Sequence, residues 1–284
     1  MSNISTKKKV LTLASSLLII FILIGIVSAA DVGYILKSKN KPDKQVLSVF
    51  REIGLTYDLI EDGKVKTTDL TKYKLIFIGD ERLRNTKTLP IYNYPTVIMN
   101  GYHGFEWGLT SDDGLSQLSA DKALSVKMTN NGVKQVYTKA NDGGRYLFYY
   151  YMDDNSRLNN FNTVARTWAG IGNRFSDVGD AIAVAPVGTV LLNGKISKEN
   201  MCFFGLVESK FWTEDAKQMF KDCIGYVGVT CSQNSDCGNE VIGSPYCKEG
   251  NVFKDTTTPV CEEPGNILSR CVNQVVSNKI EDCE

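Results

Sequence analysis

The only histidine of the chain lies in a glycine-punctuated segment that directly follows an apolar run. The segment reads Gly101-Tyr102-His103-Gly104, and Glu106 and Trp107 follow it closely. The ordinary pKa of histidine lies near neutrality, which suits its side chain to act as a general base. If the segment follows a parallel strand, it lies where open α/β sheets bind ligands. We therefore expect Tyr102, His103, Glu106 and Trp107 to line a ligand site without catalysing a reaction; the alternative is a turn histidine packed near Trp107.

Other polar motifs are better explained as ordinary turns and strands than as metal, dinucleotide or glycan sites. The paired acids Asp112-Asp113 and Asp153-Asp154 lie beside Gly or Asn, whereas a metal site needs several converging oxygens. The segment Gly170-Ile171-Gly172-Asn173 lacks the spacing of a dinucleotide-binding loop. The aromatic run from Tyr146 to Tyr151 predicts a strand, with glycan stacking as the alternative. We expect no metal and no cofactor.

All eight cysteines lie in the last third of the chain. An even number of cysteines in an exported chain indicates disulfides. A zinc site is disfavoured because the chain has no Cys-x-x-Cys pair and no histidine near these residues. Cys202 and Cys223 either pair with each other or stay as buried thiols, and the pairing of the others is left open. The predicted disulfide cysteines are Cys202, Cys223, Cys231, Cys237, Cys247, Cys261, Cys271 and Cys283.

The N-terminus has the layout of an export signal. Lys7-Lys8-Lys9 precede an uncharged run from Val10 to Val27, and Ser28-Ala29-Ala30 supplies the small residues of a cleavage site before Asp31. The run is also close to the length that spans a bilayer. The segment is therefore either cleaved or retained as a membrane anchor, and we expect a secreted or membrane-anchored protein with its body outside the cell.

The charge of the chain argues against nucleic acid as a partner. The 284 residues contain 32 basic and 32 acidic side chains, so the formal net charge is zero. Phosphate binding needs clustered Lys and Arg, and the sequence has no such cluster beyond the leader.

Short apolar runs alternate with helical patterns in the first half of the chain. Strands are predicted at 32–36, 57–60, 75–78 and 96–100, and a helix opens at Pro42-Asp43 and ends at Gly54. This alternation predicts an α/β fold, a flavodoxin-like sandwich with a mostly parallel sheet.

The second half is less regular. Strands are predicted at 123–128 and 135–138 across an Asn130-Asn131-Gly132 turn, and again at 146–151, 181–185, 189–192 and 201–206. A helix from about Thr213 to Val227 closes the domain. The last segment has few long apolar runs, so cross-links must hold it. We expect a leader at 1–30, an α/β domain at 31–229 and a disulfide-rich module at 230–284.

Two passages resemble a known fold family. Asp69-Leu70-Thr71-Lys72-Tyr73-Lys74-Leu75-Ile76-Phe77-Ile78-Gly79 is one, and the other runs from Pro186 to Gly194, followed by Cys202-Phe203-Phe204-Gly205-Leu206 and Trp212-Thr213-Glu214-Asp215-Ala216. Together they are similar to the class I glutamine-amidotransferase-like fold, in its trehalose-utilisation-type branch, over residues 32–228. The cysteine-spaced tail resembles small disulfide modules of archaeal surface proteins.

The resemblance implies a cysteine nucleophile on a sharp Gly-x-Cys-x-Gly turn and a later histidine, and this sequence has neither. No cysteine precedes residue 202, and no histidine follows His103. A thiolate attack needs both groups, so we expect a non-catalytic pseudoenzyme that binds a ligand, an envelope protein or a glycan. Two alternatives stay open: an extracellular hydrolase for a sugar or peptide that uses His103 with Glu106 or Asp113, and a structural envelope component whose tail is an assembly module.

Overall fold

The computed structural model describes residues 30–84, 86–89, 91–110, 115–119, 125–130, 132–138, 147–151, 158, 160–171, 174–228, 231–265 and 269–282. The predicted leader lies outside these ranges, apart from Ala30. None of the helices in the described part of the chain is long and apolar enough to cross a membrane.

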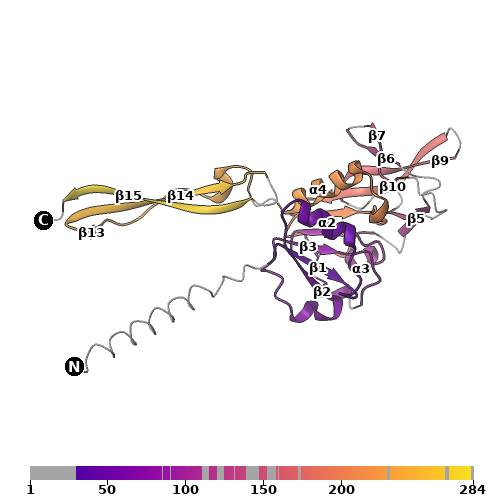
Figure 1. The fold of residues 1–284 in the computed structure, drawn as a ribbon, viewed down its shortest axis with the longest axis horizontal. Coiled ribbons are helices and arrows are strands. Elements are labelled where there is room, and N and C mark those ends of the chain that lie inside the picture. The colour runs from indigo at the N-terminus through magenta and orange to yellow at the C-terminus, as the bar shows by residue number, and fades with distance from the viewer. Residues whose placement is uncertain are drawn as a thin grey trace, which may run out of the picture.

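Five parallel strands form one half of a large sheet, in the order β2-β1-β3-β4-β11 (Figure 1). This is the flavodoxin-like order 2-1-3-4-5. The predicted α/β class is therefore confirmed. The strands are β1 (Val32–Leu36), β2 (Tyr57–Glu61), β3 (Leu75–Ile78), β4 (Thr96–Ile98) and β11 (Met201–Phe204).

Antiparallel strands form the other half, so the sheet as a whole is mixed. β10 pairs with β11 and continues the order through β9 and β6 to β7, while β8 pairs with both β10 and β5. These strands are β5 (Leu115–Ser119), β6 (Ser125–Met128), β7 (Gly132–Gln135), β8 (Leu147–Tyr151), β9 (Asn162–Ile171) and β10 (Arg174–Ala185).

Two helices cover one face of the parallel strands. They are α2 (Lys44–Glu52) and α4 (Glu214–Gly228). Phe77 of β3 contacts Phe50 of α2 at 5.5 Å and Phe220 of α4 at 5.7 Å between ring centroids. Both helices therefore pack on the same side of the sheet, and burial of these aromatic rings is a main source of the stability of this layer.

Irregular chain covers the opposite face. This cover includes the 3₁₀ helices η1 (Asp62–Thr67) and η2 (Thr86–Thr88) and the short helix α3 (Gly104–Trp107). The Tyr73 ring lies directly over Gly33 of β1, where an added Cβ would approach it to 2.8 Å. Gly33 is required here because the tyrosine occupies the space of a side chain.

Most elements of the first half match the sequence prediction, and several of the second half do not. Asp43 caps α2, as predicted, and Thr213 Oγ1 accepts a hydrogen bond from Ala216 N at the start of α4. The strand predicted at 135–138 is wrong: β7 ends at Gln135, and Tyr137 only forms an isolated bridge with Trp212. The strand predicted at 189–192 is also wrong, because Val190 only bridges Ile196 across the predicted Asn193-Gly194 turn.

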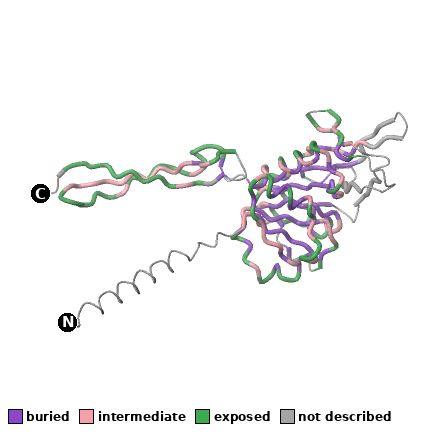
Figure 2. The backbone as a smooth tube through the Cα atoms, in the orientation of Figure 1, coloured by how far each residue is buried: buried purple, intermediate pink, exposed green. Residues whose placement is uncertain are grey.

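The C-terminal part forms a separate four-stranded sheet, drawn as a long arm in Figure 1. Two long strands, β14 and β15, pair along their length. Most described residues of this arm are exposed or half-buried, whereas the body has a continuous buried core (Figure 2). The elements are η4 (Asn234–Cys237), β12 (Val241–Ile242), β13 (Tyr246–Lys248), β14 (Asn251–Glu262) and β15 (Arg270–Asp282).

Three disulfides are described. Cys202 of β11 bonds Cys223 of α4, which confirms their mutual pairing. In the arm, Cys231 bonds Cys261 and Cys237 bonds Cys271, so the segment around η4 is fixed to the end of the β14–β15 hairpin where the two strands are connected. Cys247 is also disulfide-bonded, and Cys283 lies outside the described residues. The predicted domain boundaries at 30 and 229 stay predictions.

Candidate functional site

The segment with the histidine follows β4 at the carboxyl edge of the parallel sheet, as the sequence predicts. Asn100 fixes its start: the buried amide Nδ2 donates to the carbonyls of Gly79 (2.8 Å) and Glu81 (2.7 Å), and Oδ1 accepts from Tyr102 N (3.0 Å). The segments that leave β3 and β4 are therefore tied together by one side chain. The 3₁₀-rich connection after β3 and the helix α3 after β4 lie against each other.

Three of the four predicted ligand-binding residues are hydrogen-bonded to the connection after β3. His103 Nε2 accepts from Leu83 N (3.1 Å), and Nδ1 lies 3.0 Å from Glu106 Oε2. Glu106 also accepts a hydrogen bond from the hydroxyl of Thr86. The buried indole of Trp107 donates to the Thr86 carbonyl at 3.2 Å. These contacts hold the two segments together.

The hydrogen bonds assign the tautomer of His103. Leu83 N–H is a donor, so Nε2 must be unprotonated and Nδ1 must carry the proton that it donates to Glu106. Burial lowers the pKa of His103, and this effect outweighs the opposing attraction of Glu106. The neutral ring is therefore favoured, and its only basic lone pair is already bonded to a backbone amide. In this arrangement His103 has no free nitrogen with which to accept a proton from a substrate.

Tyr102 differs from its three neighbours. Its ring is half-buried, and the Arg82 guanidinium lies over it at 5.1 Å from the centroid. Ligand binding by these four residues stays a prediction.

A second group of polar side chains lies where the strand order reverses, between the ends of β1 and β3. The Asp43 carboxylate caps α2 and accepts hydrogen bonds at 2.6 Å from the buried Ser209 hydroxyl, which follows β11. The Tyr34 hydroxyl accepts from Asp43 N at 3.4 Å. Burial raises the pKa of Tyr34 well above its ordinary value, and the nearby carboxylates of Asp43, Glu81 and Asp80 add to this effect.

Glu208 and Tyr137 extend this group. Burial raises the pKa of Glu208, and Asp43 raises it further, while Lys210 opposes the shift. The fully buried Tyr137 hydroxyl accepts from Glu208 N at 3.3 Å, and burial raises the pKa of Tyr137 well above its usual range. The group thus holds two neutral phenols beside several acids. Its contacts, with the Ser209 hydroxyl on the Asp43 carboxylate among them, join α2, β1 and the end of β11.

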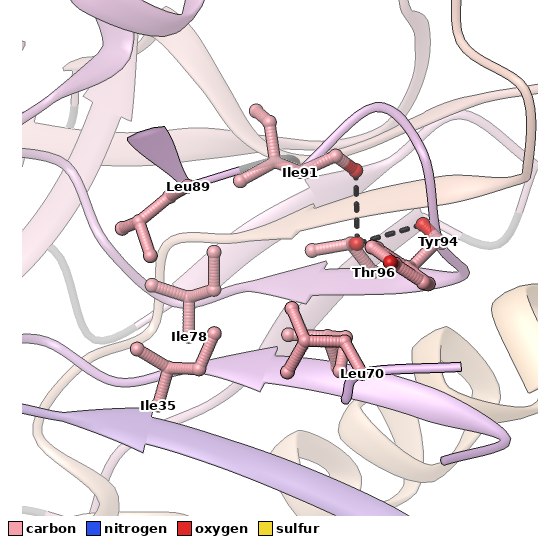
Figure 3. Close-up of a pocket in the computed structure, with 8 residues that line it drawn as sticks. Ile35, Leu70, Ile78, Leu89, Ile91, Tyr94 and Thr96 are labelled. Atoms are coloured by element: carbon pink, nitrogen blue, oxygen red, sulfur yellow. Dashed lines mark hydrogen bonds between the residues drawn. The ribbon is translucent and has the colours of Figure 1, made fainter. Parts of the chain in front are cut away.

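An apolar cavity lies under the irregular cover of the sheet (Figure 3). Its volume of about 10 Å³ is at the lower limit for a single water molecule. The hydroxyl of Thr96, one of its lining residues, is bonded to the carbonyls of Ile91 (2.9 Å) and Tyr94 (2.7 Å). This cavity is a packing defect and no ligand site. Its lining consists of Ile35, Leu70, Ile76, Ile78, Leu89, Ile91, Tyr94 and Thr96.

An open polar groove of about 390 Å³ lies along β2, the edge strand of the parallel half. This volume is within the range of small-molecule pockets. The lining contains four consecutive residues of β2, two lysines and one tyrosine. Tyr73 donates a hydrogen bond to Asp58 at 2.9 Å, which lowers the pKa of that carboxyl, and Lys72 lies 3.2 Å from the same oxygen. The lining residues are Lys39, Asp58, Leu59, Ile60, Glu61, Lys64, Thr68 and Tyr73.

Several residues weighed in the sequence cannot be placed. Asp112, Asp113, Asp153, Asp154 and Tyr146 lie outside the described residues. The remaining aromatic run forms β8, as predicted, and Gly170-Ile171 ends β9. In the arm, the sulfurs of Cys231, Cys237 and Cys271 lie within 4.8 Å of one another. All three are in disulfides, so they offer no thiolate to a metal.

The sequence did not predict the groove along β2 or the polar group formed by Tyr34, Asp43, Tyr137, Glu208 and Ser209. Their residues come from elements far apart in the chain, and each has an ordinary explanation by itself. In the sequence, Asp43 is explained as a helix cap and Tyr34 as a core residue of a strand. Only the edge position of β2 could have been predicted. In the flavodoxin-like order 2-1-3-4-5, the second strand of the chain is the outermost strand of the sheet.

Comparisons with known proteins leave the family open. No protein-family model matches the chain, and no curated protein matches it. One solved structure that it resembles is that of PurLQS from Thermotoga maritima, with 14% sequence identity over 69% of this chain and 97% of that chain, and a TM-score of 0.36. A likeness this loose supports neither a family nor a function.

Proposed function

We propose that this protein is an exported, non-catalytic binding domain that captures an extended peptide segment of a partner protein along β2. The observation that carries the proposal is the open polar groove of about 390 Å³ on the edge strand of the sheet. The three disulfides support the exported location, since such bonds persist in oxidising compartments. The leader-like N-terminus of the sequence supports it too.

The outer edge of β2 offers backbone hydrogen bonds to a partner. Among the strands of the described residues, β1 alone pairs with β2. Thr56 O accepts from Val32 N, so residue 56 faces β1. Backbone groups alternate in direction along a strand, which turns those of Tyr57, Leu59 and Glu61 outward. An added peptide strand would satisfy these groups, as in β-augmentation.

The side chains of the groove suit a peptide of mixed charge. Lys39 and Lys64 face the same groove as Asp58 and Glu61, so neither sign of charge dominates. Glu61 Oε1 accepts from Lys39 N at 3.4 Å, which ties the loop after β1 to the end of β2. A strongly anionic or cationic ligand would meet like charges here, and a polypeptide with both signs would not.

The geometry of His103 supports binding over catalysis. The Nε2 lone pair accepts the Leu83 N–H, and the Nδ1 proton is directed to Glu106. A hydrolase that used His103 with Glu106 would have to break both contacts to free a base. Asp113, the other partner of that alternative, lies outside the described residues.

Two probes test the proposal on residues 31–284: a displayed library of random peptides and an array of glycans. We expect selected peptides, and no glycan, to bind. Leu59→Pro removes an outward N–H while it spares the ladder with β1, because proline is tolerated on strand edges. It should weaken peptide binding at least about tenfold, as expected for lost main-chain hydrogen bonds.

Leu59→Ala is the matched control, since it keeps the N–H and shortens the side chain. It should retain most of the binding that Leu59→Pro loses. Peptides that bind equally well to both variants would contradict the use of this edge. Glycan binding without peptide binding would show that the ligand is a glycan and not a peptide. Turnover of a peptide or sugar that is abolished by His103→Ala would show that the protein is an enzyme.

A further inference from the structure

β15 presents a second open strand edge, on the arm. It spans Arg270–Asp282 and pairs with β14 on one side. Within the described residues, no strand lies on its other side, whereas β14 is flanked by β12 and β13 as well as β15. At a rise of about 3.4 Å per residue, this free edge is about 44 Å long.

The middle of β15 lacks the usual protection of a free edge, although the register with β14 shifts at Ile280, which is skipped in the pairing. Natural proteins discourage edge pairing with charges, prolines, bulges or short strands. From Val272 to Asn278 the strand has no charged residue and no proline. Val275 and Val276 are exposed by 58% and 55%, and Ile280 by 52%. Such an edge favours a partner strand.

We propose that β15 pairs antiparallel with β15 of a second copy of this chain, with Val276 on the two-fold axis. This register places Gln274 opposite Asn278 and Val276 opposite its own copy; the register shift at Ile280 ends the regular alternation beyond Lys279. Because side chains alternate between the faces of a strand, all of these residues lie on one face. On this face valine therefore meets valine and amides meet amides, as stabilising cross-strand pairs do.

Neighbouring registers do not have this complementarity. An axis at Val275 would place Val272 opposite Asn278 and Gln274 opposite Val276. An axis between the two valines would place Val272 opposite Lys279. On the face of Gln274, Val276 and Asn278 the strand is thus self-complementary about one residue, which is what an isologous dimer of identical chains requires. On its other face this register places Val275 opposite Ser277. An unrelated partner would not demand this internal symmetry.

Analytical ultracentrifugation of residues 31–284 over a wide range of protein concentrations tests the proposal. The native chain should show a reversible monomer–dimer equilibrium. Val276→Lys would place two lysines opposite each other at the axis, so it should raise the dimer dissociation constant at least about tenfold. Mass analysis of the disulfides and circular dichroism should confirm that the arm of each variant is folded.

Ile242→Lys is the matched control. Ile242 and Val276 flank Thr256 from opposite sides and are similarly exposed, at 58% and 55%, but Ile242 lies on β12, away from the free edge of β15. This control should leave the dissociation constant unchanged. A native chain that stays monomeric at every concentration would overturn the proposal, and so would equal weakening by both variants, which would indicate general apolar association.

The dimer and the peptide groove are separable. Leu59→Pro changes the edge of β2 and should leave the dimer intact. A dimer that Leu59→Pro disrupts and Val276→Lys does not would assign self-association to β2 and overturn the β15 interface. The peptide-binding test with its own variants is read independently of this result.

Discussion

His103 has the contacts of a structural histidine. One ring nitrogen accepts from Leu83 N, and the other is directed to Glu106, which also accepts from Thr86. The side chain is 13% exposed. Protonation would place a new N–H against the Leu83 N–H, so the charged ring cannot keep this arrangement. The lowered pKa of His103 agrees with this geometry.

The stability of the protein should therefore depend on pH through His103. The folded pKa lies below the ordinary value of 6.5, so the unfolded chain binds the proton more readily. The contribution of His103 is fully present above about pH 6.5 and is lost as the pH falls through the folded pKa. Chemical denaturation of the native chain at several pH values between neutrality and acid should show a decreasing free energy of unfolding.

The variant His103→Gln isolates this contribution, because glutamine retains an acceptor but does not titrate. The difference in unfolding free energy between the native chain and this variant should shrink towards acid pH. His103→Leu leaves Leu83 N–H without its acceptor and should cost about 1–2 kcal/mol at neutral pH. A difference that is constant or grows towards acid pH would contradict the neutral tautomer.

At the scale of elements, a close backbone contact joins the end of α3 to the loop before β11. Gly108 has φ +74°, and an added Cβ would lie 2.7 Å from the backbone nitrogen of Asn193. Leu192 N donates to Gly108 O at 2.9 Å. The loop thus rests on the element that carries His103 and Glu106.

Gly108→Ala should destabilise the protein by more than the left-handed backbone alone explains. Gly194 is the matched control, since it has φ +76° and no neighbour within 4 Å of an added Cβ. Gly194→Ala should cost about 1 kcal/mol, the strain of alanine in this region. Gly108→Ala should cost at least about 1 kcal/mol more, because backbone has to move. Equal thermal unfolding curves for the two variants would show that the contact is absent.

Local sequence signals predicted the parallel half of the fold well. β1 and β3 are continuous apolar runs because both of their faces are covered, and Asp43 marks the start of α2. The same reasoning missed β9 and the first part of β10. Asp180 is buried there, where it accepts from Leu158 N and Thr163 Oγ1. A buried carboxylate with partners distant in sequence cannot be recognised from local hydrophobicity.

The long strands of the arm were missed for a related reason. β14 and β15 have no apolar core to produce alternation, and most of their residues are exposed or half-buried. Their remaining signal is β-propensity, in Thr256-Thr257-Thr258 and Val275-Val276. The sequence correctly indicated a segment held by cross-links. The candidate site was predicted in its position after β4, and the alternative of a histidine packed near Trp107 agrees with the 5.5 Å between their ring centroids. The hydrogen bond of His103 to Leu83 could not be predicted, because it depends on a connection twenty residues earlier in the chain.

The whole molecule combines a cored body and a cross-linked arm. The body buries aromatic residues between the sheet and its two helices, and Cys202–Cys223 joins the same two layers. In the arm, Cys261 and Cys271 lie opposite each other in register, yet each bonds to the segment around η4. The two partner surfaces that we propose, on β2 and β15, lie one on each part.

The central claim is that this chain works outside the reducing cytoplasm, and its disulfides test that claim most directly. The protein should be isolated from its native source with free thiols alkylated before lysis, and its peptides should be mapped by mass spectrometry without reduction. We predict linked peptides for Cys202–Cys223, Cys231–Cys261 and Cys237–Cys271. Alkylated, unlinked cysteines at these positions in the mature protein would contradict the claim.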